Sequence, residues 1–259
     1  MTRTQLQNVR RHFHDYAKSY LANAGDMRHM MELKHEHCVF VARNCRELAV
    51  SNGWKSKDIN TAEALGFLHD IGRFSQLEEY GTFMDAQSIN HGERGWQAIT
   101  EGDLLDELEP QLRSAILDGV RHHNARTIPE GLPKDHLRWV KLIRDADRLD
   151  IYRIVLDAIE NDKLEEHPEI GLGLSLEGDP CAVVMESILA REAPAYTDLE
   201  SFSDFVLLIL SWVNLMGYPS TLKMMRERGI IDRFSQHLPM ELPRVGRLIS
   251  ELRKTVDTA

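Results

Sequence analysis

The sequence has few cysteines and no long apolar run. Its 259 residues include three cysteines, scattered and without a C-x-x-C pair, which argues against a disulfide framework or a cysteine-based zinc knuckle. The longest apolar-rich stretch, 205–216 (FVLLILSWVNLM), contains Ser211 and Asn214 and is too short to span a bilayer. The N-terminal stretch MTRTQLQNVRRHFHDY is polar and shows no secretory signal. We therefore expect a cytoplasmic protein that does not bind a membrane.

An excess of positive charge is also lacking. The formal net charge is -10, which repels a phosphate backbone at long range and disfavours a nucleic-acid polymer as partner. A small phosphorylated substrate stays compatible with this charge, because a bound metal ion can invert the local field. The chain has 12 histidines, and their placement carries more information than their number.

Period-two alternation and Asn-Gly or Asp-Gly hairpin turns are missing, whereas helical periodicity recurs along the chain. We therefore predict an all-α protein. Gly53 and Gly72 each follow an apolar helical pattern, and we interpret both as C-terminal caps. The expected helices cover residues 4–23, 28–52, 57–71, 86–100, 111–123, 135–160, 181–191, 202–216, 220–228 and 242–256.

Irregular segments suggest how the chain is organised. We expect an N-terminal helix at 1–24, a compact helical domain at 25–160, and a helical extension at 161–259 that belongs to the same domain and completes its pocket. The Gly- and Pro-interrupted segment 165–180 is either a surface loop or a lid. The run 205–216 is either core or a dimer face, which leaves a homo-oligomer open.

Histidines and aspartates occur as spaced clusters, each on a different expected helix or helix end. These are nitrogen and oxygen donors, which suit a divalent transition metal such as Mn, Fe, Co, Ni or Zn. The pair His69-Asp70 ends an apolar helix, where an ionised carboxylate without a counter-charge would cost several kcal/mol. A metal cation removes that cost. The candidate ligands in chain order are His37, His69, Asp70, His91, His122, His123 and Asp147.

This ordered pattern resembles the HD-domain superfamily of metal-dependent phosphohydrolases. The local sequences agree: H-x-x-x-V-A-R begins at His37, L-H-D-I-G-R covers 68–73, and D-A-D-R-L-D covers 145–150. The resemblance extends over roughly residues 25–160. It implies an HD-domain-like helical bundle, followed here by the C-terminal helical extension.

The resemblance also implies a ligand set for one or two ions. A first ion would be held by His37, His69, Asp70 and Asp147, with Asp145 as the alternative to Asp147. The remaining histidines look like those of the dinuclear branch of the superfamily, in which the aspartate of the His-Asp pair bridges two metals. A second ion would then be held by Asp70, His91, His122 and His123.

The expected reaction is hydrolysis of a phosphoester by a metal-activated hydroxide, with a small phosphorylated metabolite or nucleotide as substrate. Asp70 and Arg73 are the expected catalytic residues, and the candidates for binding substrate phosphate are Arg73, Arg126 and Arg148. Asn124 follows His122-His123 where cyclic-dinucleotide phosphodiesterases of the branch carry a glutamate, and no G-Y-P follows there. A cyclic dinucleotide is therefore not the expected substrate.

Two other functions use the same residues. Some HD-fold proteins are di-iron oxygenases, and a dinuclear site of this composition is compatible with that chemistry. A non-catalytic, nucleotide-sensing module would keep the fold and bind a ligand without turnover. Such modules usually lack some of the metal ligands, whereas all of the core set is present here.

Overall fold

The computed structural model describes residues 1–258 and confirms an all-α protein. Within these residues the β pairing is limited to one isolated bridge between Ser175 and Ser201. In the same range no helix combines the length and the apolar character that crossing a membrane requires. The α-helices are α1 (Arg3–Leu21), α2 (Arg28–Ser51), α3 (Ser56–Leu68), α4 (Gly72–Tyr80), α5 (His91–Glu101), α6 (Pro110–His122), α7 (Lys134–Glu160), α8 (Ala182–Leu189), α9 (Phe202–Ser211), α10 (Pro219–Glu227), α11 (Ile230–Ser235) and α12 (Pro243–Asp257).

The prediction missed two short helices, α4 and α11. Gly53 does follow α2 in the left-handed conformation (φ 67°) that a C-terminal cap requires. The same interpretation is wrong for Gly72, which is the first residue of α4. A Cβ atom at Gly72 would lie 2.5 Å from the carbonyl oxygen of His91 and from the amide nitrogen of Gly95. Gly72 is therefore required for the close approach of α4 to α5.

The chain forms two compact units, Met1–Asp147 and Arg148–Ala259. The division falls inside α7, so this helix contributes its first half to one unit and its second half to the other. The expected division at 24/25 and 160/161, with an extension that completes the pocket, stays a prediction. All of the metal-ligand candidates belong to the first unit.

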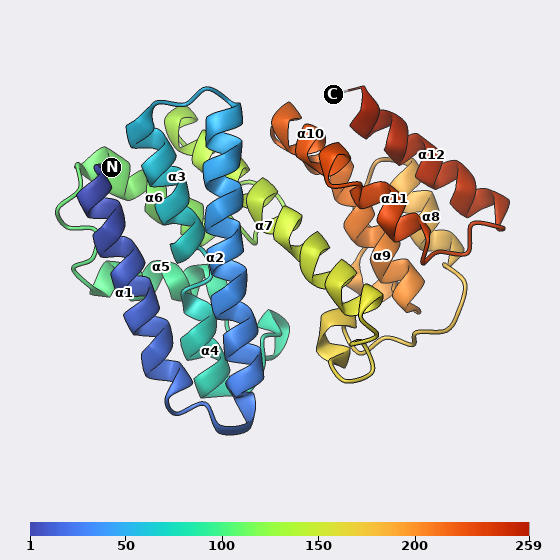
Figure 1. Cartoon of the computed structure of the whole chain (residues 1–259), viewed down its shortest axis with the longest axis horizontal. Coiled ribbons are helices and arrows are strands. Elements are labelled where there is room, and N and C mark those ends of the chain that lie inside the picture. Colours follow the sequence, from blue (N-terminus) through green and yellow to red (C-terminus); the bar gives the residue numbers. More distant parts are fainter. Residues whose placement is uncertain (259) are drawn as a thin grey trace. The chain divides into compact units, whose positions relative to one another are not determined.

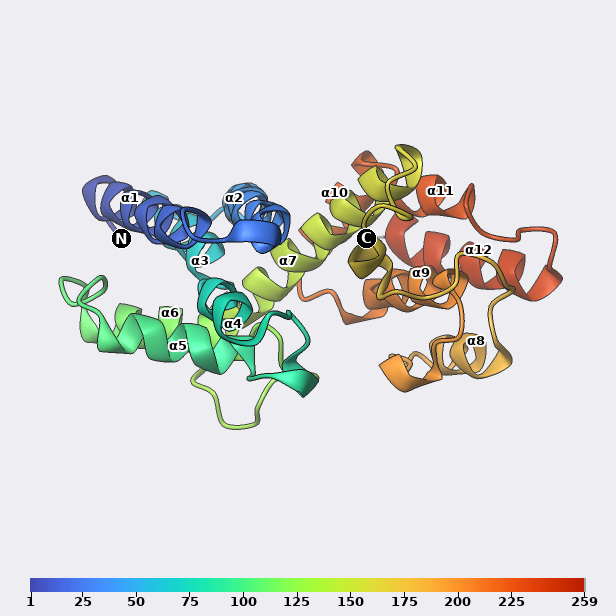
Figure 2. The ribbon, with the colours of Figure 1, turned by 90° about the horizontal axis from the view of Figure 1, so that it is seen from below.

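In the first unit, α1, α2 and α3 pack on one another, and α5 packs on α6 (Figure 1). Figure 2 shows α1–α3 on one side of this unit and α5–α6 on the other, with α4 between them. Contacts of α3 with α6 and of α4 with α5 join the two layers. The two layers are therefore in contact, and residues of α2 and α3 can meet residues of α5 and α6 between them.

Helices α2 and α3 of the first unit approach each other closely. A Cβ atom at Gly66 of α3 would lie 2.4 Å from the Cα atom of Ala42 of α2, so only glycine fits there. On the same stretch of α2, Cys38, Val41 and Cys45 are buried, as an amphipathic helix facing a core predicts. The close approach brings His37 of α2 near His69, which directly follows α3.

The second unit is built around α9. Phe205, Val206 and Leu210 are buried together with the residues between them, so this part of the apolar run 205–216 belongs to the core. Ser201 caps the helix in a capping box with Asp204, a residue that is fully buried. The expected irregular segment 165–180 contains one short 3-10 turn, Pro168–Gly171.

Candidate metal centre

The His69-Asp70 pair lies in the tight connection between α3 and α4. His69 follows the last residue of α3, and the amide of Arg73 donates to the carbonyl oxygen of Asp70 at 2.9 Å, which begins the first turn of α4. The break in the helix turns both side chains inward, and His69 and Asp70 are 0% and 3% exposed. The pair is therefore buried at the point where the two helical layers meet.

Six histidine and aspartate side chains form a cluster around Asp70. We call its first half the four donors that come from three parts of the chain: His37, His69, Asp70 itself and Asp147. The Nε2 atom of His37 lies 3.1 Å from Oδ1 of Asp147 and 3.6 Å from Oδ2 of Asp70. The Nε2 atom of His69 lies 3.3 Å from that of His37 and 3.8 Å from each of the two carboxylates. His37, His69 and Asp70 lie close enough together to hold one ion, and Asp147 lies close to both of these histidines. Asp147 also forms a possible donor group with His69 and with His123 on the other side of Asp70.

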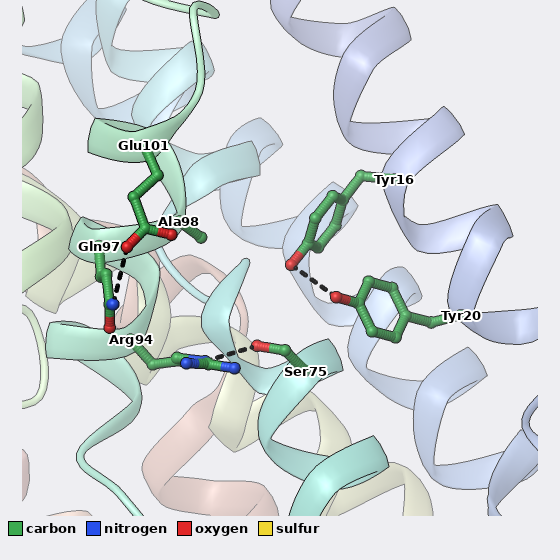
Figure 3. Close-up of a pocket in the computed structure, with 7 residues that line it drawn as sticks. All are labelled: Tyr16, Tyr20, Ser75, Arg94, Gln97, Ala98 and Glu101. Atoms are coloured by element: carbon green, nitrogen blue, oxygen red, sulfur yellow. Dashed lines mark hydrogen bonds between the residues drawn. The ribbon is translucent and has the colours of Figure 1, made fainter.

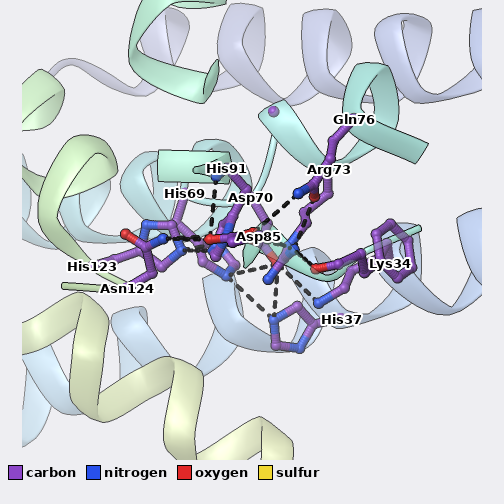
Figure 4. Close-up of polar contacts among 12 residues, drawn as sticks. Lys34, His37, His69, Asp70, Arg73, Gln76, Asp85, His91, His123 and Asn124 are labelled. Carbon is purple, nitrogen blue, oxygen red and sulfur yellow. Dashed lines mark hydrogen bonds and ion pairs between the residues drawn. The ribbon is translucent and has the colours of Figure 1, made fainter. Parts of the chain in front are cut away.

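Three donors converge on the other side of Asp70 and form the second half of the cluster. The Nε2 atoms of His91 and His123 lie 3.4 and 3.3 Å from Oδ1 of Asp70 and 3.0 Å from each other. His91 is the first residue of α5, and His123 directly follows α6. Asp70 thus presents one carboxylate oxygen to each half of the cluster (Figure 4). Asp70 is therefore shared by two groups of side chains, each of which is able to hold a metal ion.

The ring nitrogens that face away from the cluster have hydrogen-bond acceptors. Nδ1 of His69 donates to the carbonyl oxygen of Gly66 at 2.8 Å, and Nδ1 of His123 donates to that of Val120 at 2.7 Å. A carbonyl oxygen only accepts, so in the neutral ring the proton is on Nδ1 and the lone pair is on Nε2. Burial lowers the pKa of His69, and it lowers that of His91 to about 4. Neutral rings with lone pairs facing one another are the state in which histidine binds a metal.

The bridging carboxylate itself is under-satisfied by protein donors. Oδ1 of Asp70 is buried and has no hydrogen-bond partner within residues 1–258. Burial favours a higher pKa for Asp70, but Lys34 and the surrounding histidines outweigh it and hold the pKa well below its usual value. A buried, ionised oxygen without a donor is costly, and a cation between Oδ1, His91 and His123 would satisfy it.

Two cationic side chains flank Asp70. Nζ of Lys34 lies 3.0 Å from Oδ2 of Asp70, and Nε of Arg73 lies 3.7 Å from its Oδ1. Both cationic groups also lie over the ring of Phe83, at 5.5 and 5.6 Å from its centroid. Arg73 is further paired with Asp85 at 3.0 Å, whereas its buried Nε has no hydrogen-bond partner in the described structure.

Sequence reasoning missed Lys34 and Asp85. Lys34 lies three residues before His37 on α2, a spacing that places both on one helix face, so the sequence did contain a signal for it. Asp85 lies in a 3-10 turn between α4 and α5 and accepts from Nδ1 of His91. Its distance from His91 in the sequence carries no comparable signal, because a loop has no fixed periodicity.

Several predicted site residues are not brought into the cluster. His122 is next to His123, but it is half-buried and belongs to none of the described donor groups. Arg126 is exposed, and Arg148, in the second unit, donates to the carbonyl oxygen of Leu215 at 3.0 Å. Asp147 rather than Asp145 faces the histidines.

A separate polar pocket lies between α1, α4 and α5 (Figure 3). Its volume is about 260 Å³, and no histidine or aspartate lines it. Tyr16 and Tyr20 share a hydroxyl hydrogen bond of 3.1 Å, and Nε of Arg94 donates to Ser75. Its one carboxylate, Glu101, accepts from Gln97 at 2.8 Å, so the pocket does not offer a group of histidine and carboxylate donors like that of the cluster.

Residues 35–152 match the family model of the HD domain, and this range contains all six residues of the cluster. No curated protein and no solved structure matches the chain. The fold and the donor set agree with this match, so residues 35–152 are identified as an HD domain, the all-α domain of a superfamily of metal-dependent hydrolases. HD domains bind divalent metals, and the His/Asp groups of this chain are able to hold them.

Proposed function

We propose that the protein hydrolyses a phosphoester of a small metabolite or nucleotide, with one or two divalent transition-metal ions in the cluster. The observation that carries this proposal is the position of Asp70 between two sets of histidines, with a buried oxygen that no protein group satisfies. The donor set fits such ions: His37, His69, Asp70 and Asp147 would hold one, and Asp70, His91 and His123 a second. When bound, the ions would supply Lewis acidity and lower the pKa of a coordinated water.

The flanking cations favour a phosphorylated substrate. The ammonium of Lys34 and the guanidinium of Arg73 flank the bridging carboxylate, and the side chains of both are mostly buried. In this position they would attract and orient the oxygens of a phosphoryl group and stabilise charge that develops on them. Nε of Arg73 makes no hydrogen bond within residues 1–258 and lies 3.7 Å from Oδ1 of Asp70, so it would donate to a ligand oxygen bound beside that carboxylate while Asp85 holds Nη1.

The proposal is tested with protein purified without chelators. We expect bound divalent metal by elemental analysis, and turnover of phosphomonoesters or phosphodiesters in a panel assayed with Mn, Co and Ni. Asp70→Asn should lose both ions and the activity. Asp106→Asn, which removes the same charge from an exposed ion pair with Arg113, should keep both. Metal-loaded protein that turns over no phosphoester, or activity that survives Asp70→Asn, would contradict the proposal.

A di-iron oxygenase is the second candidate, because a site with four histidines and two carboxylates also suits iron. It predicts iron in the purified protein and dioxygen uptake that depends on an organic substrate. A non-catalytic sensing module predicts nucleotide binding without any turnover. The same preparation therefore distinguishes all three functions.

A further inference from the structure

Asp85 is a carboxylate beside the cluster with hydrogen bonds to four other residues, although it is not one of the six cluster donors. Its two oxygens lie 2.8 and 2.7 Å from Nδ1 of His91. It also accepts from Nη1 of Arg73 at 3.0 Å, from Nε2 of Gln76 at 3.0 Å and from Nδ2 of Asn124 at 3.1 Å. A single loop residue is thus bonded to α4, to α5 and to the segment that follows α6.

His91 needs a hydrogen-bond acceptor from this loop because of its position at the start of α5. His69 and His123 each donate from Nδ1 to a carbonyl oxygen three residues earlier, at the end of their own helix. His91 is the first residue of α5, so no turn of that helix precedes it. The loop supplies a carboxylate instead, which is a stronger acceptor than a carbonyl and makes the imidazole a better donor to a metal.

The loop is itself held by α4. Gln76 is fully buried, and its Nε2 lies within hydrogen-bond distance of Asp85, of Oγ of Ser88 and of the carbonyl oxygen of Ile89, among which its two protons are shared. Arg73 donates to the carbonyl oxygen of Phe83 as well as to Asp85. Asp85 is thereby fixed against His91 from two sides and is not left to a flexible turn.

We propose that Asp85 is a positioning residue that holds His91 for the second ion, so that the affinity of the second half of the cluster depends on Asp85 and that of the first half does not. The inference rests on the proposed two-ion site and specifies which residue controls its second ion. The hydrogen bonds and ion pairs of Asp85 go to Arg73, Gln76, His91 and Asn124, and His91 is the cluster donor among these four partners. Loss of such a partner typically weakens metal binding about 10–100-fold.

The test is a titration of metal-free wild-type protein and of Asp85→Asn with Mn²⁺, followed by calorimetry. In the variant we expect the second equivalent to bind about 10–100-fold more weakly and the first equivalent to bind as in the wild type. Glu79→Gln is the matched control, because it removes one negative charge from the ion pair of α4 with Arg94 on α5 and contacts no donor of the cluster. It should leave both equivalents unchanged.

A second measurement does not depend on the folding of a variant. In the metal-free wild type, ¹⁵N-edited NMR of the histidine rings should show the proton of His91 on Nδ1, with the signal assigned by its loss in His91→Gln. A proton on Nε2 of His91 would overturn the inference, and so would an unchanged second equivalent in Asp85→Asn. A wild type that binds only one ion would also overturn the inference, whereas phosphoester hydrolysis with one ion would still stand. The proposed function fails only if metal-loaded protein turns over no phosphoester or if activity survives Asp70→Asn.

Discussion

The two halves of the cluster differ in how the fold positions their donors. The first half takes His37 from within α2 and Asp147 from within α7, and it places His69 directly after α3. The second half takes His91 and His123 from helix ends and depends on a loop carboxylate. Donors within packed helices are positioned by the core, whereas donors at helix ends need partners of their own. The first half should therefore respond to changes in core packing, and the second to changes in the connections.

The largest effect on this comparison is expected from Gly66→Ala. The added methyl would lie 2.4 Å from Cα of Ala42, and backbone atoms cannot move aside as a side chain can. Such overpacking typically costs about 1–3 kcal/mol of stability, and it would also separate His37 from His69. We expect a lower midpoint in denaturant unfolding and weaker binding of the first Mn²⁺ equivalent, measured by calorimetry.

Gly72→Ala is the equivalent substitution beside the second half of the cluster. Its methyl would lie 2.5 Å from the carbonyl oxygen of His91, so it should displace the start of α5 and weaken the second equivalent more than the first. Equal weakening of both equivalents by the two variants would show that the cluster responds as one rigid body. The distinction between its halves would then be wrong.

The same distinction explains which parts of the cluster the sequence reveals. His37, His69-Asp70 and Asp147 lie in or next to long periodic helices, and their order and flanking residues were enough to place them together. His122 and His123 are consecutive at the end of α6, so their side chains point in directions about 100° apart, and periodicity alone does not say which one faces inward. Only His123 does.

Gly72 illustrates a second limit. A glycine after an apolar helical stretch fits a C-terminal cap, but the same residue also fits a close helix crossing, and only the position of α5 decides between them. The fold class needed no such information, because helical periodicity and the absence of strand patterns are local properties. Asp85 is the opposite case, since its role depends entirely on tertiary contacts from Arg73, Gln76 and Asn124.

Lys34→Gln tests how a neighbouring positive charge affects the first half of the cluster. The ammonium of Lys34 lies 3.0 Å from Oδ2 of Asp70, the oxygen that faces the first half, and its positive charge opposes a cation there. Its removal should tighten the first Mn²⁺ equivalent. The KM for a phosphoester should rise by on the order of tenfold, since a hydrogen bond to a charged group contributes about 1.5–3 kcal/mol.

Arg28→Gln is the control for Lys34→Gln. It removes a positive charge from the same helix, where Arg28 forms an exposed pair with Glu32. It should change neither the metal affinity nor the KM. If Lys34→Gln weakens the first ion, the lysine supports the carboxylate more than it competes with the metal.

The smallest effect concerns Tyr16, which lies outside both halves and lines the pocket between α1, α4 and α5. Burial, and next the hydrogen bond with Tyr20, raise the pKa of Tyr16 above its ordinary value of 10.0. The unfolded chain therefore releases this proton first as the pH rises, so the contribution of Tyr16 to stability is complete below pH 10 and is lost progressively above it. Denaturant unfolding should show a steeper loss of stability above pH 10 in the wild type than in Tyr16→Phe, while Mn²⁺ binding at neutral pH is the same in both. A change in the affinity for either Mn²⁺ equivalent in Tyr16→Phe would mean that the contact of α1 with α4 also supports the cluster. The second half would then depend on α1 as well.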